Sequence, residues 1–195
     1  MKMTATALEG LQVVQLDRLD DARGHLLRVF DALEWAPHGE DLSGWAQVVT
    51  SFTATKNTLR GMHYQLPPYA EGKLVVPLTG RMFWASVDVR PNSPTLGRWH
   101  GETLEAVDGA ALAAAPGFAH GCLSLSGDVT LLILSTHTHR VDGGAGFRWD
   151  DPSVAITWPD LGAPPHLSPA HRRLPRFDAF AEGLGIARER EAVHA

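Results

Sequence analysis

The 195-residue chain lacks the features that mark secreted, membrane-spanning and nucleic-acid-binding proteins. Its single cysteine, Cys122, excludes an internal disulfide, and its apolar neighbours suggest a small core residue in a reducing cytoplasm. No apolar run reaches about 18 residues and Met1–Leu8 is not a long apolar stretch, so we expect neither a secretion signal nor a membrane partner. The net charge of −5, without a long basic block, also argues against nucleic acid as a partner.

Short apolar segments separated by turn residues recur at intervals of roughly ten residues, which is typical of a β-sandwich or barrel. We therefore predict a mostly β fold with short peripheral helices, in one domain over residues 1–195. Pro164-Pro165 marks the expected end of the barrel, and residues 164–195 would form a C-terminal extension that packs on it. Gly143-Gly144 is interpreted as a flexible turn. The predicted strands are Leu11–Leu16, Leu26–Phe30, Trp45–Thr53, Thr58–Gln65, Lys73–Thr79, Arg81–Asp88, Trp99–Leu104, Ala111–Ala114, Gly121–Ser126, Val129–Thr136 and Ala155–Thr157, and the predicted helices lie within residues 31–40 and Phe177–Ala192.

The run Leu59-Arg-Gly-Met-His-Tyr-Gln65, followed by Lys73, places a histidine between two cations in β-type sequence. Histidine has an ordinary pKa of about 6.5, which suits proton abstraction near neutral pH. Arginine can hold a phosphate through its planar guanidinium. The pattern indicates a pocket with a base and two positive charges, although one buried structural histidine and two surface cations would give the same letters.

Seven motifs occur along the chain, namely Asp21-Ala-Arg-Gly24, Leu59-Arg-Gly-Met-His-Tyr-Gln65, Gly72-Lys-Leu-Val75, Val87-Asp-Val-Arg90, Ser93-Pro-Thr-Leu-Gly97, Pro116-Gly-Phe-Ala-His-Gly121 and Trp149-Asp-Asp-Pro152. Through their order and spacing the chain resembles the dTDP-4-dehydrorhamnose 3,5-epimerase family from about residue 10 to residue 170. The resemblance implies a cupin-type double-stranded β-helix, or jelly roll. It also implies a homodimer without metal or cofactor that epimerises a nucleotide-diphospho-4-keto-6-deoxysugar at C3, C5 or both through an enolate.

The resemblance also implies roles for individual residues. His63 would be the base, and Lys73 would stabilise the enolate oxygen, because a fixed cation in a dry pocket suits a developing negative charge. Asp88 would either lie in the pocket or form a structural ion pair with Arg90. The remaining expected substrate contacts are Arg23 and Arg60 to the diphosphate, Gln65 of the same motif, and the pocket histidine His120.

Three positions depart from the family pattern. Ile133 stands where the family has the tyrosine that reprotonates the sugar, and isoleucine cannot donate a proton. His139 stands at a second tyrosine position, and His171 replaces the aspartate that orients the base. The polar residues that address thymine are also poorly matched, because Val48 and Thr50 occupy their spacing and Gln47 lies one residue away.

The departures leave two interpretations open. Either another residue or solvent supplies the second proton, or the protein is a non-catalytic or differently catalytic sugar-nucleotide-binding cupin. On a continuous strand His139 would lie roughly 20 Å from Ile133, too far to replace the missing hydroxyl. The pair His137 and His139 has a metal-binding spacing, but a cupin metal site needs ligands from an earlier strand, where only His63 is present, so we expect no metal.

Overall fold

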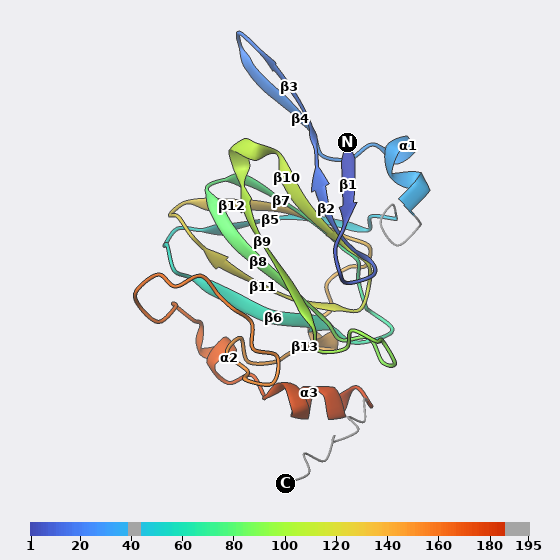
Figure 1. Ribbon diagram of the computed structural model, residues 1–195, viewed down its shortest axis with the longest axis vertical. Coiled ribbons are helices and arrows are strands. Elements are labelled where there is room, and N and C mark those ends of the chain that lie inside the picture. The colour runs from blue at the N-terminus through green and yellow to red at the C-terminus, as the bar shows by residue number, and fades with distance from the viewer. Residues whose placement is uncertain (39–43, 186–195) are drawn as a thin grey trace.

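The computed structural model describes residues 1–38 and 44–185, and within these ranges two antiparallel sheets lie face to face (Figure 1). The first sheet has the strand order β1 (Lys2–Ala5), β2 (Leu11–Gln15), β10 (Ala110–Ala114), β7 (Lys73–Thr79), β12 (Val129–Ser135) and β5 (Gln47–Thr53). The second has the order β13 (Gly144–Gly146), β6 (Leu59–Gln65), β11 (Phe118–Ser124), β8 (Arg81–Asp88) and β9 (Trp99–Glu105).

The space between the two sheets is filled at one end and open at the other. Val75, Leu112 and Leu131 of the first sheet meet Trp84 and Phe118 of the second in one buried cluster. Such burial of apolar side chains is the main favourable contribution to folding. The prediction of a mostly β jelly roll is confirmed by this arrangement.

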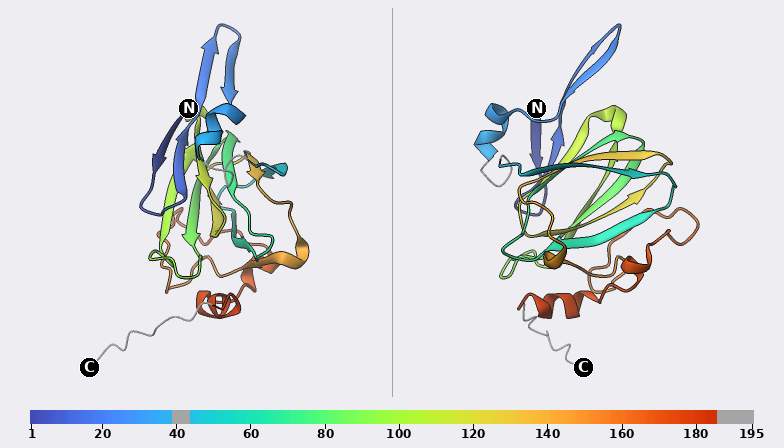
Figure 2. Two further views of the ribbon diagram at one scale, coloured as in Figure 1. Left: turned by 90° about the vertical axis from the view of Figure 1, so that its right-hand side faces the viewer. Right: turned by 180° about the vertical axis from the view of Figure 1, so that it is seen from behind.

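Outside the two sheets lie a hairpin and the short helices. The hairpin of β3 (Asp17–Asp21) and β4 (Gly24–Arg28) projects away from the barrel (Figure 2). Phe177 and Phe180 of α3 (Phe177–Gly183) pack with Met62 and Phe147, so α3 in the expected C-terminal extension covers the outside of the second sheet. The other helical segments are α1 (Ala32–Trp35), α2 (Pro169–Arg172) and the 3-10 turns η1 (Ala36–His38), η3 (Ala106–Asp108) and η4 (Val141–Gly143). None of the described helices is long and apolar enough to cross a bilayer.

The predicted strand bounds are confirmed for β7 and β8 and are shifted by a few residues elsewhere. The predicted strand Ala155–Thr157 is wrong, because these residues form irregular chain. Strands β1, β3 and β13 are missing from the prediction. The two predicted helices are shorter than expected: residues 32–38 and Phe177–Gly183 are helical, and residues 39–40 and 186–192 lie outside the described ranges.

Gly143-Gly144 is not simply a flexible turn, because Gly144 begins β13, whose Gly146 lies beside His63 of β6. A Cβ atom on Gly146 would lie only 2.0 Å from the carbonyl oxygen of Met62. The glycine is therefore required for the close approach of β13 to β6.

Gly61 has the same role on the other side of β6. Its φ is +125°, and a Cβ atom there would lie 2.6 Å from the carbonyl oxygen of His120. We expect Gly61→Ala to lower the free energy of unfolding by at least about 2 kcal/mol, because strain and a backbone clash add together. Urea unfolding would measure this. Gly183→Ala, where a Cβ atom meets nothing within 4 Å, is the control, and an equal effect in both variants would contradict the explanation.

Candidate active site

The open end of the barrel forms a cavity of about 470 Å³, within the range of small-ligand sites. Both sheets contribute to its walls, and α2 closes one side. The lining residues used below are Ser51, Arg60, His63, Gln65, Glu71, Lys73, Trp84, His120, Ile133, His139 and His171.

His63 lies on β6, between β11 and β13, and faces the open cavity. Its Nε2 is 2.7 Å from Nε2 of His171, a distance at which one imidazole donates an N–H hydrogen bond to the other. Burial by surrounding protein, followed by the effect of nearby positive groups, lowers the pKa of His63 from 6.5 to about 4. These groups are His171, Lys73, Arg60 and His139. His63 is therefore neutral at pH 7, in the form that can accept a proton.

His171 reaches this contact from α2. Its backbone N–H donates to Oγ of Ser168, the N-cap of the helix, at 3.2 Å. Burial, followed by the charge of Arg60, lowers the pKa of His171 below its usual range. The structure thus places His171 against the expected base as a second neutral imidazole.

His120 lies directly across from His63 in the β6–β11 register and is 3% exposed. Its Nδ1 is 3.3 Å from Nε1 of Trp84 and 3.1 Å from Oγ of Ser86. Burial, with the charges of Lys73 and His63, lowers the pKa of His120 well below 6.5. The cavity wall around His63 therefore carries two neutral histidines, His171 and His120.

Lys73, on β7 in the opposite sheet, forms an ion pair with Glu71 at the cavity edge. Its Nζ is also 3.5 Å from Oγ of Ser135. Sequence reasoning missed Glu71, whose side chain is only 9% exposed. The available signal was an acid two residues before a lysine, a spacing that can bring two side chains to one side of an extended chain.

Arg60 extends from β6 into the cavity lining. Its Nε donates to Oγ1 of Thr53 at 3.2 Å, and one Nη group donates to the carbonyl oxygen of Phe52 at 3.2 Å. A guanidinium has five N–H groups, so donors remain for an anion in the cavity. These contacts fix the side chain without neutralising its charge.

Ile133 faces the cavity from β12, in the sheet opposite His63. The expected separation of roughly 20 Å from His139 assumed a continuous strand, and that assumption is wrong because β12 ends at Ser135. The chain then turns, and His139 lines the same cavity as Ile133. Its backbone N–H donates to Oε1 of Gln47 at 2.8 Å. On β5, strand alternation places Gln47 on the cavity side with Ser51.

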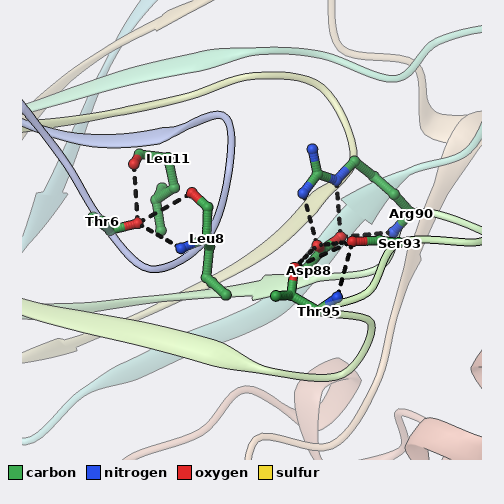
Figure 3. Close-up of polar contacts among 7 residues, drawn as sticks. All are labelled: Thr6, Leu8, Leu11, Asp88, Arg90, Ser93 and Thr95. Atoms are coloured by element: carbon green, nitrogen blue, oxygen red, sulfur yellow. Dashed lines mark hydrogen bonds and ion pairs between the residues drawn. The ribbon is translucent and has the colours of Figure 1, made fainter.

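Two of the expected substrate contacts, Arg23 and Asp88, lie outside this cavity. Arg23 lies at the tip of the β3–β4 hairpin, where its side chain is 90% exposed and pairs with Asp21. Asp88 is fully buried outside the cavity lining, where it accepts hydrogen bonds from Arg90, Ser93 and Thr95 (Figure 3). Burial alone would raise the pKa of Asp88, but these hydrogen bonds lower it to about 2. The alternative of a structural ion pair therefore describes Asp88.

Gln65 lines the cavity, but its amide is already engaged. Nε2 donates to the carbonyl oxygen of Tyr69 at 3.1 Å, and Oε1 accepts from the backbone N–H of Arg140 at 2.6 Å. Gln65 thus holds the loop that leads to β13. Within residues 1–38 and 44–185, no group of three or more His, Cys, Asp or Glu side chains is gathered as metal ligands.

Comparison with known proteins agrees with this geometry. The family model for dTDP-4-dehydrorhamnose 3,5-epimerase matches residues 5–179. The dTDP-4-dehydrorhamnose 3,5-epimerase of Sinorhizobium fredii is 34% identical over 161 residues, covering 83% of this chain and 82% of the relative.

Solved structures show the same fold. The dTDP-6-deoxy-D-glucose-3,5-epimerase of Legionella pneumophila, solved with dTDP-4-keto-L-rhamnose, has a TM-score of 0.85 and 30% identity, covering 94% of this chain and 96% of that chain. The 3'-monoepimerase ChmJ of Streptomyces bikiniensis, solved with dTDP-quinovose, has a TM-score of 0.83 and 29% identity, covering 93% of this chain and 90% of that chain. The match along the sequence and the shared fold show that the chain belongs to the dTDP-4-dehydrorhamnose 3,5-epimerase family, a family of sugar-nucleotide isomerases.

Proposed function

We propose that this epimerase acts on a dTDP-4-keto-6-deoxysugar and exchanges a hydrogen next to the ketone faster than it inverts that carbon. The observation that carries the proposal is a neutral histidine, His63, facing Lys73 across a cavity whose opposite wall presents Ile133. Support for the thymidine nucleotide comes from relatives whose structures hold dTDP-sugars.

The reaction begins with proton removal. The 4-keto group acidifies the hydrogens on C3 and C5, and His63 takes one of them. When His63 donates its Nε2–H to His171, the lone pair of Nδ1 is free to act as the base. The electron pair of the broken C–H bond moves into the enolate, whose oxygen is stabilised by Lys73.

Proton return proceeds without the tyrosine of the family pattern, because Ile133 stands in its place. Ile133 has no proton to give, so water entering the open cavity protonates the enolate. Return of a solvent-derived proton from His63 to the same face gives exchange without inversion, whereas inversion requires water to protonate the opposite face. Inversion is therefore slower than exchange with solvent.

The test is incubation of the enzyme with dTDP-4-keto-6-deoxyglucose in deuterium oxide, followed by NMR. We expect deuterium at C3 or C5 before the inverted product accumulates. Tight binding of the nucleotide without exchange at either carbon would instead support a sugar-nucleotide-binding protein.

Arg60 is expected to bind the diphosphate. Arg60→Ala should weaken the binding of dTDP by about 1.5 kcal/mol, roughly tenfold, because a charge-assisted hydrogen bond is lost. Isothermal calorimetry would measure the dissociation constants. Arg81→Ala, which removes an exposed cation outside the cavity lining, is the matched control. Equal affinities for Arg60→Ala and the wild type would refute the contact.

The hairpin supports a homodimer as part of the proposal. It exposes Leu19 (60%) and Leu26 (57%), and apolar side chains on a projecting hairpin suit contact with a second copy. Arg23 would then reach the partner's diphosphate rather than its own. Sedimentation should give twice the chain mass, and Arg23→Ala should bind dTDP more weakly than the wild type. A monomeric wild type would refute the dimer, and an unchanged affinity of Arg23→Ala for dTDP would refute the contact with the partner's diphosphate.

A further inference from the structure

The orientation of His120 carries a consequence for the reaction. Trp84 reaches Nδ1 of His120 through its indole nitrogen, at 3.3 Å. An indole N–H is a donor only, so Nδ1 is the acceptor in this contact. The hydroxyl of Ser86, whose Oγ is 3.1 Å from the same Nδ1, can act as donor or acceptor and is compatible with this assignment. A neutral imidazole with an acceptor at Nδ1 carries its proton on Nε2.

The Nε2 of His120 is buried and has no hydrogen-bond partner among the described residues. A buried donor left unpaired costs about 1–3 kcal/mol, so its presence calls for a reason. His120 also lines the cavity. The side chain that carries this unpaired nitrogen is therefore part of the cavity wall.

We propose that the Nε2–H of His120 donates a hydrogen bond to the C4 oxygen of the substrate and that this bond becomes stronger as the enolate forms. Trp84 fixes the tautomer of His120 that carries this proton. This inference rests on the proposed function. His120 is the catalytic residue in this proposal, and Trp84 is a positioning residue that acts through it.

The strand register places the donor where the proposal needs it. His120 on β11 pairs directly with His63 on β6, so their side chains leave neighbouring strands at one level. When the C3 or C5 hydrogen of the sugar lies at His63, C4 is the next ring carbon, and the C4 oxygen is attached to it. Lys73 approaches from the opposite sheet, so one oxygen would receive a charged donor from one wall and a neutral donor from the other.

A neutral donor suits this position for an electrostatic reason. Burial and the charges of Lys73 and His63 keep His120 uncharged, so it does not compete with the substrate for a proton. A preorganised donor aimed at a developing oxyanion contributes about 10²- to 10³-fold to the rate in other enzymes.

The experiment compares variants that keep or remove a donor. His120→Gln retains an N–H at about the same reach, whereas His120→Leu removes it. In the deuterium-exchange assay we expect His120→Leu to lose at least about 10²-fold in kcat with little change in the binding of dTDP, and His120→Gln to recover a measurable part of that loss. Equal kcat for His120→Leu and the wild type would overturn the assignment.

Trp84→Phe removes the indole N–H at the tautomer contact together with part of the buried ring. Nitrogen NMR of the free protein should show the proton of His120 on Nε2 in the wild type and a mixture of tautomers in Trp84→Phe, with a several-fold lower kcat. Trp158→Phe is the control, since its indole N–H donates to the carbonyl oxygen of Trp149 outside the cavity lining. A wild-type proton on Nδ1 would overturn the proposal without any assay of activity.

Two failures can be told apart. If the wild type exchanges deuterium but His120→Leu does so equally well, the proposed function stands and the role of His120 falls. If no keto sugar nucleotide exchanges deuterium with the wild type, the proposed function fails and the role of His120 fails with it, even where NMR finds the expected tautomer.

Discussion

Ile133→Tyr should raise the rate of inversion relative to deuterium exchange by about 10²- to 10⁴-fold, the usual contribution of a positioned general acid. The reason is the position of this residue. Ile133 faces the cavity from β12 in the first sheet, whereas His63 faces it from β6 in the second. A phenol at residue 133 would therefore approach the enolate from the side opposite the base.

The matched control is Ile133→Phe, which has nearly the same size as tyrosine but no hydroxyl. It should crowd the cavity in the same way without raising the ratio. If the wild type already inverts both C3 and C5 as fast as it exchanges them, another residue is the acid. In that case the absence of a proton donor at Ile133 does not limit inversion.

His63→Asn should abolish deuterium exchange, with a loss of at least about 10³-fold, because His63 is the base proposed to remove the hydrogen from C3 or C5. Asparagine keeps a polar side chain of similar size, so the dissociation constant for dTDP should change little. Exchange in His63→Asn at the wild-type rate would show that another group removes the proton.

The pH dependence of the wild type tests the same residue. Because the pKa of His63 is lowered to about 4, the base stays unprotonated above that value. Exchange should therefore be nearly constant from pH 8 to about pH 5.5 and fall as the pH approaches 4. A fall centred near pH 6.5, the ordinary pKa of histidine, would show that burial does not act on His63 as described.

The sequence predicted most strands because apolar residues and turn residues alternate visibly along the chain. It could not predict β13, since Gly144 and Gly146 have no side chains to show a period, and their role depends on the distance to another strand. The strand predicted at Ala155–Thr157 has the right composition but no partner strand in the described residues.

The candidate site also contains residues that the sequence could predict and residues that it could not. His63 and Lys73 could be predicted because a motif places them, and the structure brings both to one cavity. Glu71 could not, because its role is a contact with Lys73. The expectation for His139 depended on a straight strand, and no local signal showed that β12 ends at Ser135.

The base and its partner have different kinds of support. His63 is held by strand pairing on both sides, which fixes the direction of its side chain. His171 stands on a helix of four residues outside both sheets, started by the cap at Ser168. An amide, a carboxylate or an imidazole can occupy that helix without repacking the barrel. Substitution of residue 171 can therefore change the basicity of His63 with little effect on the packing of the barrel, both in evolution and in protein engineering.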